Sequence, residues 1–320
     1  MHYMKPHLPY DKQVKVLVER GLDVGTERDA VAALRRIGYY RLSAYTYPMR
    51  RTGQDGKLNE FESGSTLADA VALHDFDHKL RLVLFGALQS LEIGLRTKVA
   101  YQLGKHGPMA HLEQESLDTN VCQTPAQGPD QEERTKFTIW REEYERQRKE
   151  ARSEDYVKHF TLNYEGDVPV WAATEFLSMG SLVRLYGLMQ SSDRKWIAHY
   201  LQVKSPEVLF GWLKALNVLR NHCAHGARIW NRKTTYPPTK VNPRMVERQL
   251  HHLQKVPNDR LYFLAACLAY MLSALHPDSR FVEDLRTTMR KVPSVPQLKP
   301  EQTMGFPEQW RSENLWQPGK

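Results

Sequence analysis

A helical repeat of apolar residues runs through positions 77–103 of this sequence and limits the folds open to it. Apolar residues recur there every three or four positions, which is the spacing of one face of an α-helix. We therefore expect one long amphipathic helix with a wide buried stripe, ended by Gly104. The members of the stripe are Leu80, Leu84, Leu88, Leu91, Leu95, Val99 and Leu103.

The same periodicity dominates most of the chain, and it predicts an all-α protein. The exception is residues 50–60, where Asp55-Gly56 indicates at most one small β-hairpin. We expect an N-terminal helical lobe over residues 1–65, a helical domain over 66–235 and a C-terminal helical extension over 236–320. Residues 244–255 should form one helix of that extension, and the tail from Val292 should be irregular. The polar residues 113–131 are expected to be an exposed insertion.

The amino-acid composition limits the class of protein and the kinds of partner to expect. The 320 residues are 41% hydrophobic, enough for a substantial core, and the net charge of +8 favours a polyanionic partner. No apolar stretch is long enough for a signal peptide or a membrane span, so we expect a cytoplasmic protein without a membrane partner.

Metal and disulfide chemistry find little support in the sequence. Cys122, Cys223 and Cys267 lack CxxC spacing, so neither a zinc site nor a disulfide framework is indicated. His222, Cys223 and His225 lie close in sequence but on diverging faces of one predicted helix, without a fourth ligand. We predict no metal and no cofactor.

One predicted helix carries a cluster of groups suited to chemistry. Ser205-Pro206-Glu207 is a strong helix start, and Gly226 is a typical end. One face of this helix is apolar. The opposite face carries Lys214, Asn217, Asn221 and His225, and Arg220 lies at the edge of the apolar stripe. The apolar face consists of Leu209, Trp212, Leu213, Leu216 and Leu219.

Arg220, Asn221 and His225 together suit metal-independent RNA cleavage. A histidine at a helix C-terminus has its charged form favoured and can transfer protons, while arginine offers a charged fork for phosphate oxygens. A ribose 2′-OH would attack the adjacent phosphorus, giving a 2′,3′-cyclic phosphate and a 5′-OH. The alternative is structural: a capping histidine and a snorkelling arginine. The bare pattern also recurs from Arg194 to His199, with Lys195 in place of the asparagine.

Arg220-Asn221-His222-Cys223-Ala224-His225 resembles the R-N-x-x-x-H motif of HEPN ribonucleases. Other segments resemble the Abi-like (AbiD/AbiF) family of bacterial abortive-infection proteins, in order from Arg20 to about Arg232. These segments are Arg20-Gly21-Leu22, Ile37-Gly38-Tyr39-Tyr40-Arg41-Leu42-Ser43-Ala44-Tyr45, His74-Asp75-Phe76-Asp77-His78-Lys79-Leu80-Arg81, Leu91-Glu92-Ile93-Gly94-Leu95-Arg96-Thr97, Pro169-Val170-Trp171, Glu175 and Met179-Gly180-Ser181-Leu182.

This resemblance implies an HEPN-type helical bundle, metal-independent endoribonuclease activity and a role in phage defence. It also implies a homodimer, because HEPN nucleases bring two such motifs together and this chain has one convincing copy. A small structured noncoding RNA is a further implied partner. Two alternatives remain open: a non-catalytic HEPN-type module that binds such an RNA, and an interaction protein that senses a phage component.

Further residues are candidates for supporting roles. Glu92 or Glu175 could hold Arg220 from a neighbouring helix, with Arg96 beside them; the alternative is ordinary Glu–Arg pairing within a helix. Basic residues after the motif and near the N-terminus are candidates for RNA binding, and the tyrosines among the latter could stack on bases or simply pack in the core. The candidates for RNA binding are Arg228, Arg232, Lys233, Arg41, Arg50 and Arg51.

Overall fold

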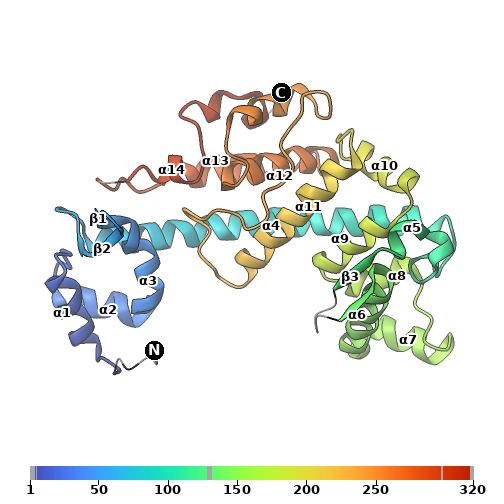
Figure 1. Cartoon of the computed structure of the whole chain (residues 1–320), viewed down its shortest axis with the longest axis horizontal. Coiled ribbons are helices and arrows are strands. Elements are labelled where there is room, and N and C mark those ends of the chain that lie inside the picture. Colours follow the sequence, from blue (N-terminus) through green and yellow to red (C-terminus); the bar gives the residue numbers. More distant parts are fainter. Residues whose placement is uncertain (1–3, 5, 128–131, 297, 318–320) are drawn as a thin grey trace.

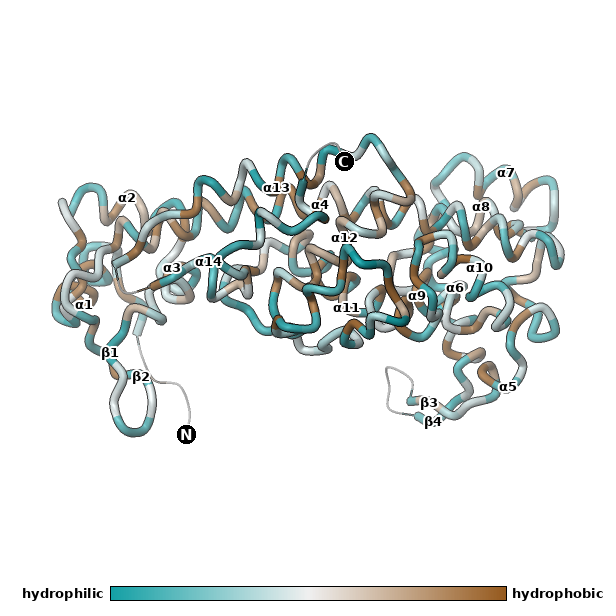
Figure 2. The backbone as a smooth tube through the Cα atoms, turned by 90° about the horizontal axis from the view of Figure 1, so that it is seen from above, coloured by the Kyte–Doolittle hydropathy of each residue, from teal (hydrophilic) through white to brown (hydrophobic). Residues whose placement is uncertain are grey.

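The computed structural model describes residue 4 and residues 6–127, 132–296 and 298–317. It is an elongated helical molecule built along one central helix, α4 (Leu67–Gly104), which runs through most of its length (Figures 1 and 2). An N-terminal lobe lies at one end of α4 and a second helical lobe at the other, while the C-terminal helices cover its middle. The all-α prediction is confirmed.

The central helix begins and ends where the sequence indicates. The Thr66 hydroxyl accepts a hydrogen bond from the backbone N–H of Asp69 (3.0 Å), which caps the helix N-terminus. Its 38 residues span about 57 Å at 1.5 Å per residue. Every member of the predicted apolar stripe is fully buried, so this face of the helix forms part of the hydrophobic core along its whole length.

The N-terminal lobe packs against the start of α4, mainly through α3. Its hairpin is the one predicted, with Gly53 opposite Gly56 across a tight turn. The elements are α1 (Tyr10–Glu19), α2 (Glu27–Ile37), α3 (Tyr39–Thr46), the 3-10 turn η1 (Tyr47–Met49), β1 (Arg50–Gly53) and β2 (Gly56–Phe61).

The second lobe packs on the far end of α4 through α8, α9 and α10. It contains a second antiparallel pair, β3–β4, beyond the single hairpin expected; each strand has three residues, too short for an alternating pattern to stand out. In the segment expected to be an exposed insertion, Leu117 and Cys122 are buried. The elements are η2 (Ala110–Leu112), η3 (Gln114–Ser116), α5 (Thr119–Cys122), β3 (Pro125–Gln127), β4 (Glu133–Thr135), α6 (Lys136–Glu150), η4 (Ala151–Ser153), α7 (Asp155–Asn163), α8 (Val170–Phe176), α9 (Met179–Leu188) and α10 (Ser191–Tyr200).

The C-terminal part differs most from expectation. The helix expected over residues 244–255 is a 3-10 helix, which places Leu250 and Leu253 on one buried side. The tail expected to be irregular forms short helical turns and buries Trp310 and Trp316 against Tyr262 of α12. The elements are α11 (Pro206–Ala224), η5 (Arg248–Lys255), α12 (Leu261–Leu275), α13 (Phe281–Met289), α14 (Pro300–Thr303), η6 (Trp310–Ser312) and η7 (Asn314–Trp316).

Hydrophobic positions recur along the packed helices (Figure 2), and residues 261–272 of α12 are buried throughout. Within the described ranges, no helix is both long enough and apolar enough to cross a bilayer.

Candidate functional site

The candidate site lies at the C-terminal end of α11, which crosses α4 near the middle of the molecule (Figure 1). The helix starts at Pro206, and the Ser205 hydroxyl accepts a hydrogen bond from the backbone N–H of Val208 (3.3 Å). The five apolar residues predicted to face inward are all buried. His225 is the C-cap residue, and Gly226 follows in the left-handed region (φ +64°), where glycine is favoured.

Arg220 is held in place by a carboxylate from the central helix. Its Nε lies 3.3 Å from Glu92 Oε2, and its guanidinium carbon lies 5.9 Å from the centre of the Phe85 ring. Glu92 is only 4% exposed, whereas the Arg220 side chain is 28% exposed. Among the described residues, nothing accepts a hydrogen bond from either Nη group of Arg220. One edge of the guanidinium is therefore anchored and the other is available to a ligand.

Glu92 also binds a second arginine. Its Oε1 accepts a hydrogen bond from Arg96 Nη2 (2.8 Å), and the same Nη2 donates to the carbonyl oxygen of Leu177 (3.0 Å). Glu175 is largely exposed and lies 4.0 Å from Arg96 Nη1. Of the two acids considered for Arg220, the structure thus brings Glu92 to it, while Glu175 contacts Arg96.

Asn221 and His225 are both exposed on the surface of this helix end. The backbone N–H of His225 donates to the carbonyl oxygen of Asn221 (2.9 Å), which places the two residues one turn apart. The neighbouring His222 is different, because its Nε2 lies 3.4 Å from Arg232 Nη1 and burial lowers its pKa. His225 is therefore the histidine of the motif that solvent and a ligand can reach.

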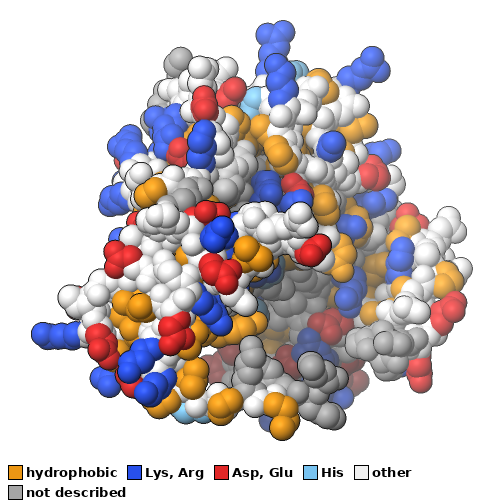
Figure 3. Space-filling model, turned by 60° about the vertical axis from the view of Figure 1, so that its left-hand side comes forward, with side chains coloured by type: hydrophobic (Ala, Val, Ile, Leu, Met, Phe, Trp, Pro, Cys, Tyr) orange, Lys and Arg blue, Asp and Glu red, His pale blue; other side chains and the backbone are white. Residues whose placement is uncertain are grey.

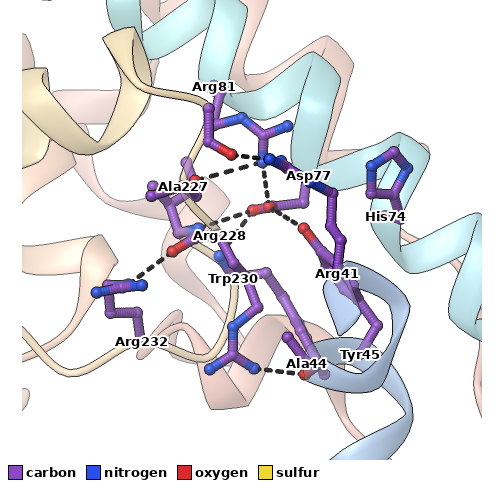
Figure 4. Close-up of polar contacts among 12 residues, drawn as sticks. Arg41, Ala44, Tyr45, His74, Asp77, Arg81, Ala227, Arg228, Trp230 and Arg232 are labelled. Atoms are coloured by element: carbon purple, nitrogen blue, oxygen red, sulfur yellow. Dashed lines mark hydrogen bonds and ion pairs between the residues drawn. The ribbon is translucent and has the colours of Figure 1, made fainter. Parts of the chain in front are cut away.

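Asp77 of α4 fixes the chain just after the motif, and sequence reasoning did not single it out. The side chain is completely buried, and Figure 4 shows the groups that surround it. Its Oδ1 accepts hydrogen bonds from the backbone N–H groups of Ile229 (3.2 Å) and Trp230 (2.7 Å). Its Oδ2 accepts from the Tyr45 hydroxyl (2.6 Å) and from Arg81. One carboxylate thus joins the N-terminal lobe, the central helix and the segment after α11.

Three of the basic residues predicted to bind RNA also hold this segment (Figure 4). Arg41 donates to the carbonyl oxygen of Gly226 (2.7 Å), and Arg228 donates to that of Ala44 (2.7 Å). Arg232 Nε in turn donates to the carbonyl oxygen of Arg228 (2.7 Å), and burial lowers the pKa of the Arg228 guanidinium. These arginines therefore surround the segment that follows α11, and each donates a hydrogen bond to a backbone carbonyl oxygen.

The other predicted RNA-binding residues are placed differently. Lys233 is exposed, 3.8 Å from Asp259. Arg50 and Arg51 belong to strand β1 of the hairpin, which lies beside the start of α4 (Figure 1), and Arg50 lies over the rings of Tyr47 and Phe61. Basic and acidic side chains are intermingled on the face that this lobe turns outward (Figure 3), so its positive charge is local rather than one continuous patch.

An open cavity, here called the motif-side cavity, lies beside the end of α11. Basic and imidazole side chains of α2, α3 and α4 line it together with the last residues of the motif helix. The sequence signal for it is the pair His74 and His78, which are four residues apart on α4. Its lining is Arg36, Ile37, Arg41, His74, His78, Arg81, Leu82, Phe85, Cys223, Ala224 and Gly226.

Cys223 lies within the motif and lines the motif-side cavity. Its side chain is buried, and burial raises the pKa of its thiol to about 12. In the part of the chain that the structure describes, no group of three or more His, Cys, Asp and Glu side chains is placed to hold a metal ion.

The sequence was compared with models of known protein families. The family model for Abi-like proteins matches residues 32–231, well over half of the chain. The match runs from α2 to the segment after α11 and so includes Asp77, Glu92, Arg220 and His225. No curated protein and no solved structure gave a match. The extent of the family match shows that this chain belongs to the Abi-like family.

Proposed function

We propose that this protein is a metal-independent endoribonuclease that acts in phage defence. Membership of the Abi-like family points to defence by abortive infection. The observation that supports the proposed chemistry is the position of Arg220. Glu92 holds its Nε, while the Nη edge of its guanidinium group is available to a ligand. Asn221 and His225 are exposed at the same end of the helix. An HEPN-type ribonuclease needs these three groups and no metal ion.

The proposed reaction is a transfer within the RNA chain. His225 takes the proton of a ribose 2′-OH, and the 2′ oxygen forms a bond to the adjacent phosphorus. Arg220 stabilises the negative charge that develops on the phosphate oxygens, and Asn221 orients one of the reacting oxygens. The bond from phosphorus to the 5′ oxygen breaks, and that oxygen receives a proton. The products are a 2′,3′-cyclic phosphate and a 5′-OH.

The second proton transfer suggests a second copy of the chain. Each chain contributes one R-N-x-x-x-H motif, so a homodimer would supply one histidine as base and the other as acid. Sedimentation of the purified protein checks this, since a dimer has twice the 37.2 kDa mass of the chain.

The second candidate is a non-catalytic HEPN-type module that binds a structured noncoding RNA. The basic residues around the motif favour it, because Arg41, His74 and His78 line the motif-side cavity whether or not cleavage takes place. In this reading the same surface holds RNA phosphates and leaves them intact.

A comparison of three proteins tests the proposal: wild type, His225→Ala and His222→Ala. Each is incubated with a mixed RNA pool in EDTA, and the new ends are mapped. We expect wild type and His222→Ala to leave cyclic phosphate and 5′-OH ends, and His225→Ala to leave none. An oligonucleotide with deoxyribose at the cleaved position should stay intact.

Two results count against this assignment. Equal cleavage by His225→Ala would show that the catalytic group lies elsewhere. Absence of cleavage by all three proteins, together with tight binding of a discrete RNA, would favour the RNA-binding module.

A further inference from the structure

A second basic cavity lies in the lobe at the other end of α11 and is here called the distal pocket. Its cationic lining comes from four different helices: Lys136 of α6, Arg184 of α9, Arg194 of α10 and Lys214 of α11. The ring of Phe210 also lines it, and Lys214 Nζ lies 4.7 Å from the centre of that ring. Residues far apart in sequence thus bring four positive charges and one aromatic face to a single hollow.

Protein carboxylates leave most of this charge uncompensated. Of the acids in the described part of the chain, Glu207 alone lies within ion-pair distance of these cations, 3.8 Å from Arg194 Nη1. Lys136, Arg184 and Lys214 are exposed and form no ion pair with any of the described residues. Like charges gathered in one cavity repel each other, so their placement favours a bound anion.

Arg194 is consistent with a bound anion in this pocket. Its side chain is 14% exposed, and its Nε is buried with no hydrogen-bond acceptor among the residues that the structure describes. A buried guanidinium N–H that lacks an acceptor costs free energy, so Arg194 has unused hydrogen-bonding capacity beside this pocket.

We propose that the distal pocket binds phosphate groups of an RNA strand, with a base against Phe210. Guanidinium and ammonium groups suit phosphate oxygens, and an aromatic ring suits an unpaired base of any sequence. Lys214 lies eleven residues before His225 on the same helix, about 16 Å at 1.5 Å per residue, so a strand of a few nucleotides reaches both. The RNA identity rests on the proposed ribonuclease function; the phosphate chemistry rests on the pocket alone.

The test uses the full-length chain carrying His225→Ala, so that the probe stays intact. Lys136, Arg184 and Lys214 are replaced together by glutamine, since all three are exposed. The probe is a fluorescein-labelled 12-nucleotide single-stranded RNA, titrated at several salt concentrations. Loss of three phosphate contacts should weaken binding and reduce the slope of log K against log salt by about 2, since each contact to single strands contributes about 0.7.

The matched control replaces Lys12, Lys15 and Lys255 by glutamine, which removes the same charge from exposed positions elsewhere. Its salt slope should equal that of the parent. ATP serves as a second probe, because a free nucleotide carries the same phosphate chemistry. Loss of ATP binding with unchanged RNA binding would support the pocket and identify a free nucleotide as its ligand.

Two results overturn the proposal: unchanged binding of both probes, or an equal loss in the control. A failure of the proposed ribonuclease function can be told apart from a failure of the pocket proposal. The former appears as absence of RNA cleavage by the wild-type protein. The binding curves of the His225→Ala chain still decide the role of the pocket.

Discussion

The carboxylate of Glu92 lies 3.3 Å from Nε of Arg220, and this contact joins the central helix to the proposed catalytic arginine. We expect Glu92→Gln to lower the rate of RNA cleavage roughly ten- to hundredfold, because a charged hydrogen bond contributes about 1.5–3 kcal/mol and about 1.4 kcal/mol corresponds to a factor of ten. The measurement is kcat on a defined RNA oligonucleotide.

Glu175→Gln is the matched control for that substitution. Glu175 is 60% exposed and reaches only Arg96, at 4.0 Å, so its removal should change kcat by less than about threefold. Similar losses from both substitutions would contradict a specific role for Glu92 in positioning Arg220.

Asp77→Asn should destabilise the fold. The buried carboxylate is the ionic partner of Arg81, which is 5% exposed, and an amide in its place leaves that guanidinium charge buried and unpaired. Breaking a buried pair in this way costs about 3–5 kcal/mol. Urea denaturation measures the free energy of unfolding.

Asp75→Asn serves as the comparison for Asp77. The Asp75 carboxylate pairs with Arg36 at 2.9 Å on the surface, where both side chains are about half exposed. Its loss should cost less than about 1 kcal/mol. A loss at position 77 as small as the one at position 75 would be inconsistent with the ionic role assigned to Asp77.

His111 should make stability depend on pH. The ring is buried against Tyr144, and neither ring nitrogen has a hydrogen-bond partner within the described ranges. Burial lowers the pKa of the ring to about 4. The unfolded chain therefore takes up a proton near pH 6.5 that the folded chain does not bind, so stability falls as the pH drops from 6.5 to 4. The loss attributable to this residue approaches about 3 kcal/mol at pH 4.

His111→Phe isolates that contribution, since phenylalanine keeps the aromatic contact and cannot be protonated. The free energies of unfolding of the two proteins, measured from pH 7.5 to 4, should differ progressively as pH falls. Parallel profiles would mean that His111 is protonated in the folded state as readily as in the unfolded chain.

The C-terminal tail should be essential for stability. Trp316 is fully buried, and its indole N–H donates to the Tyr262 hydroxyl (3.2 Å). Trp316→Ala should cost about 3–5 kcal/mol in thermal or urea unfolding. Trp171→Ala, at a position 53% exposed, should cost under about 1 kcal/mol. Equal costs at the two positions would show that the tail is not part of the stabilising core.

Local signals were sufficient for the elements that carry the motif. Ser205-Pro206-Glu207 and Gly226 predict the bounds of α11 because capping and left-handed termination depend on adjacent residues. Glu92 was one of two acids predicted to hold Arg220 from a neighbouring helix, and the sequence did not decide between Glu92 and Glu175; the structure brings Glu92 to Arg220.

Long-range relationships could not be predicted in the same way. Arg81, four residues along the same helix, is a local partner of Asp77, but its other partners are 32, 152 and 153 positions away. No periodic pattern encodes which distant segments meet it. Its local signals were a carboxylate on the same face as Leu80 and Leu84 and an arginine four residues later. The distal pocket likewise combines four helices, and the burial of Trp310 and Trp316 depends on where the tail crosses α12.

Asp77 and Glu92 stand on one uninterrupted helix, fifteen residues and about 22 Å apart. Through these two carboxylates, helix α4 binds α11 at Arg220 and the chain just beyond His225. Moving the motif would therefore require breaking two buried carboxylate contacts at once. For the proposed ribonuclease, covering the motif or withholding its RNA would therefore be a less costly way to prevent activity than distorting the motif.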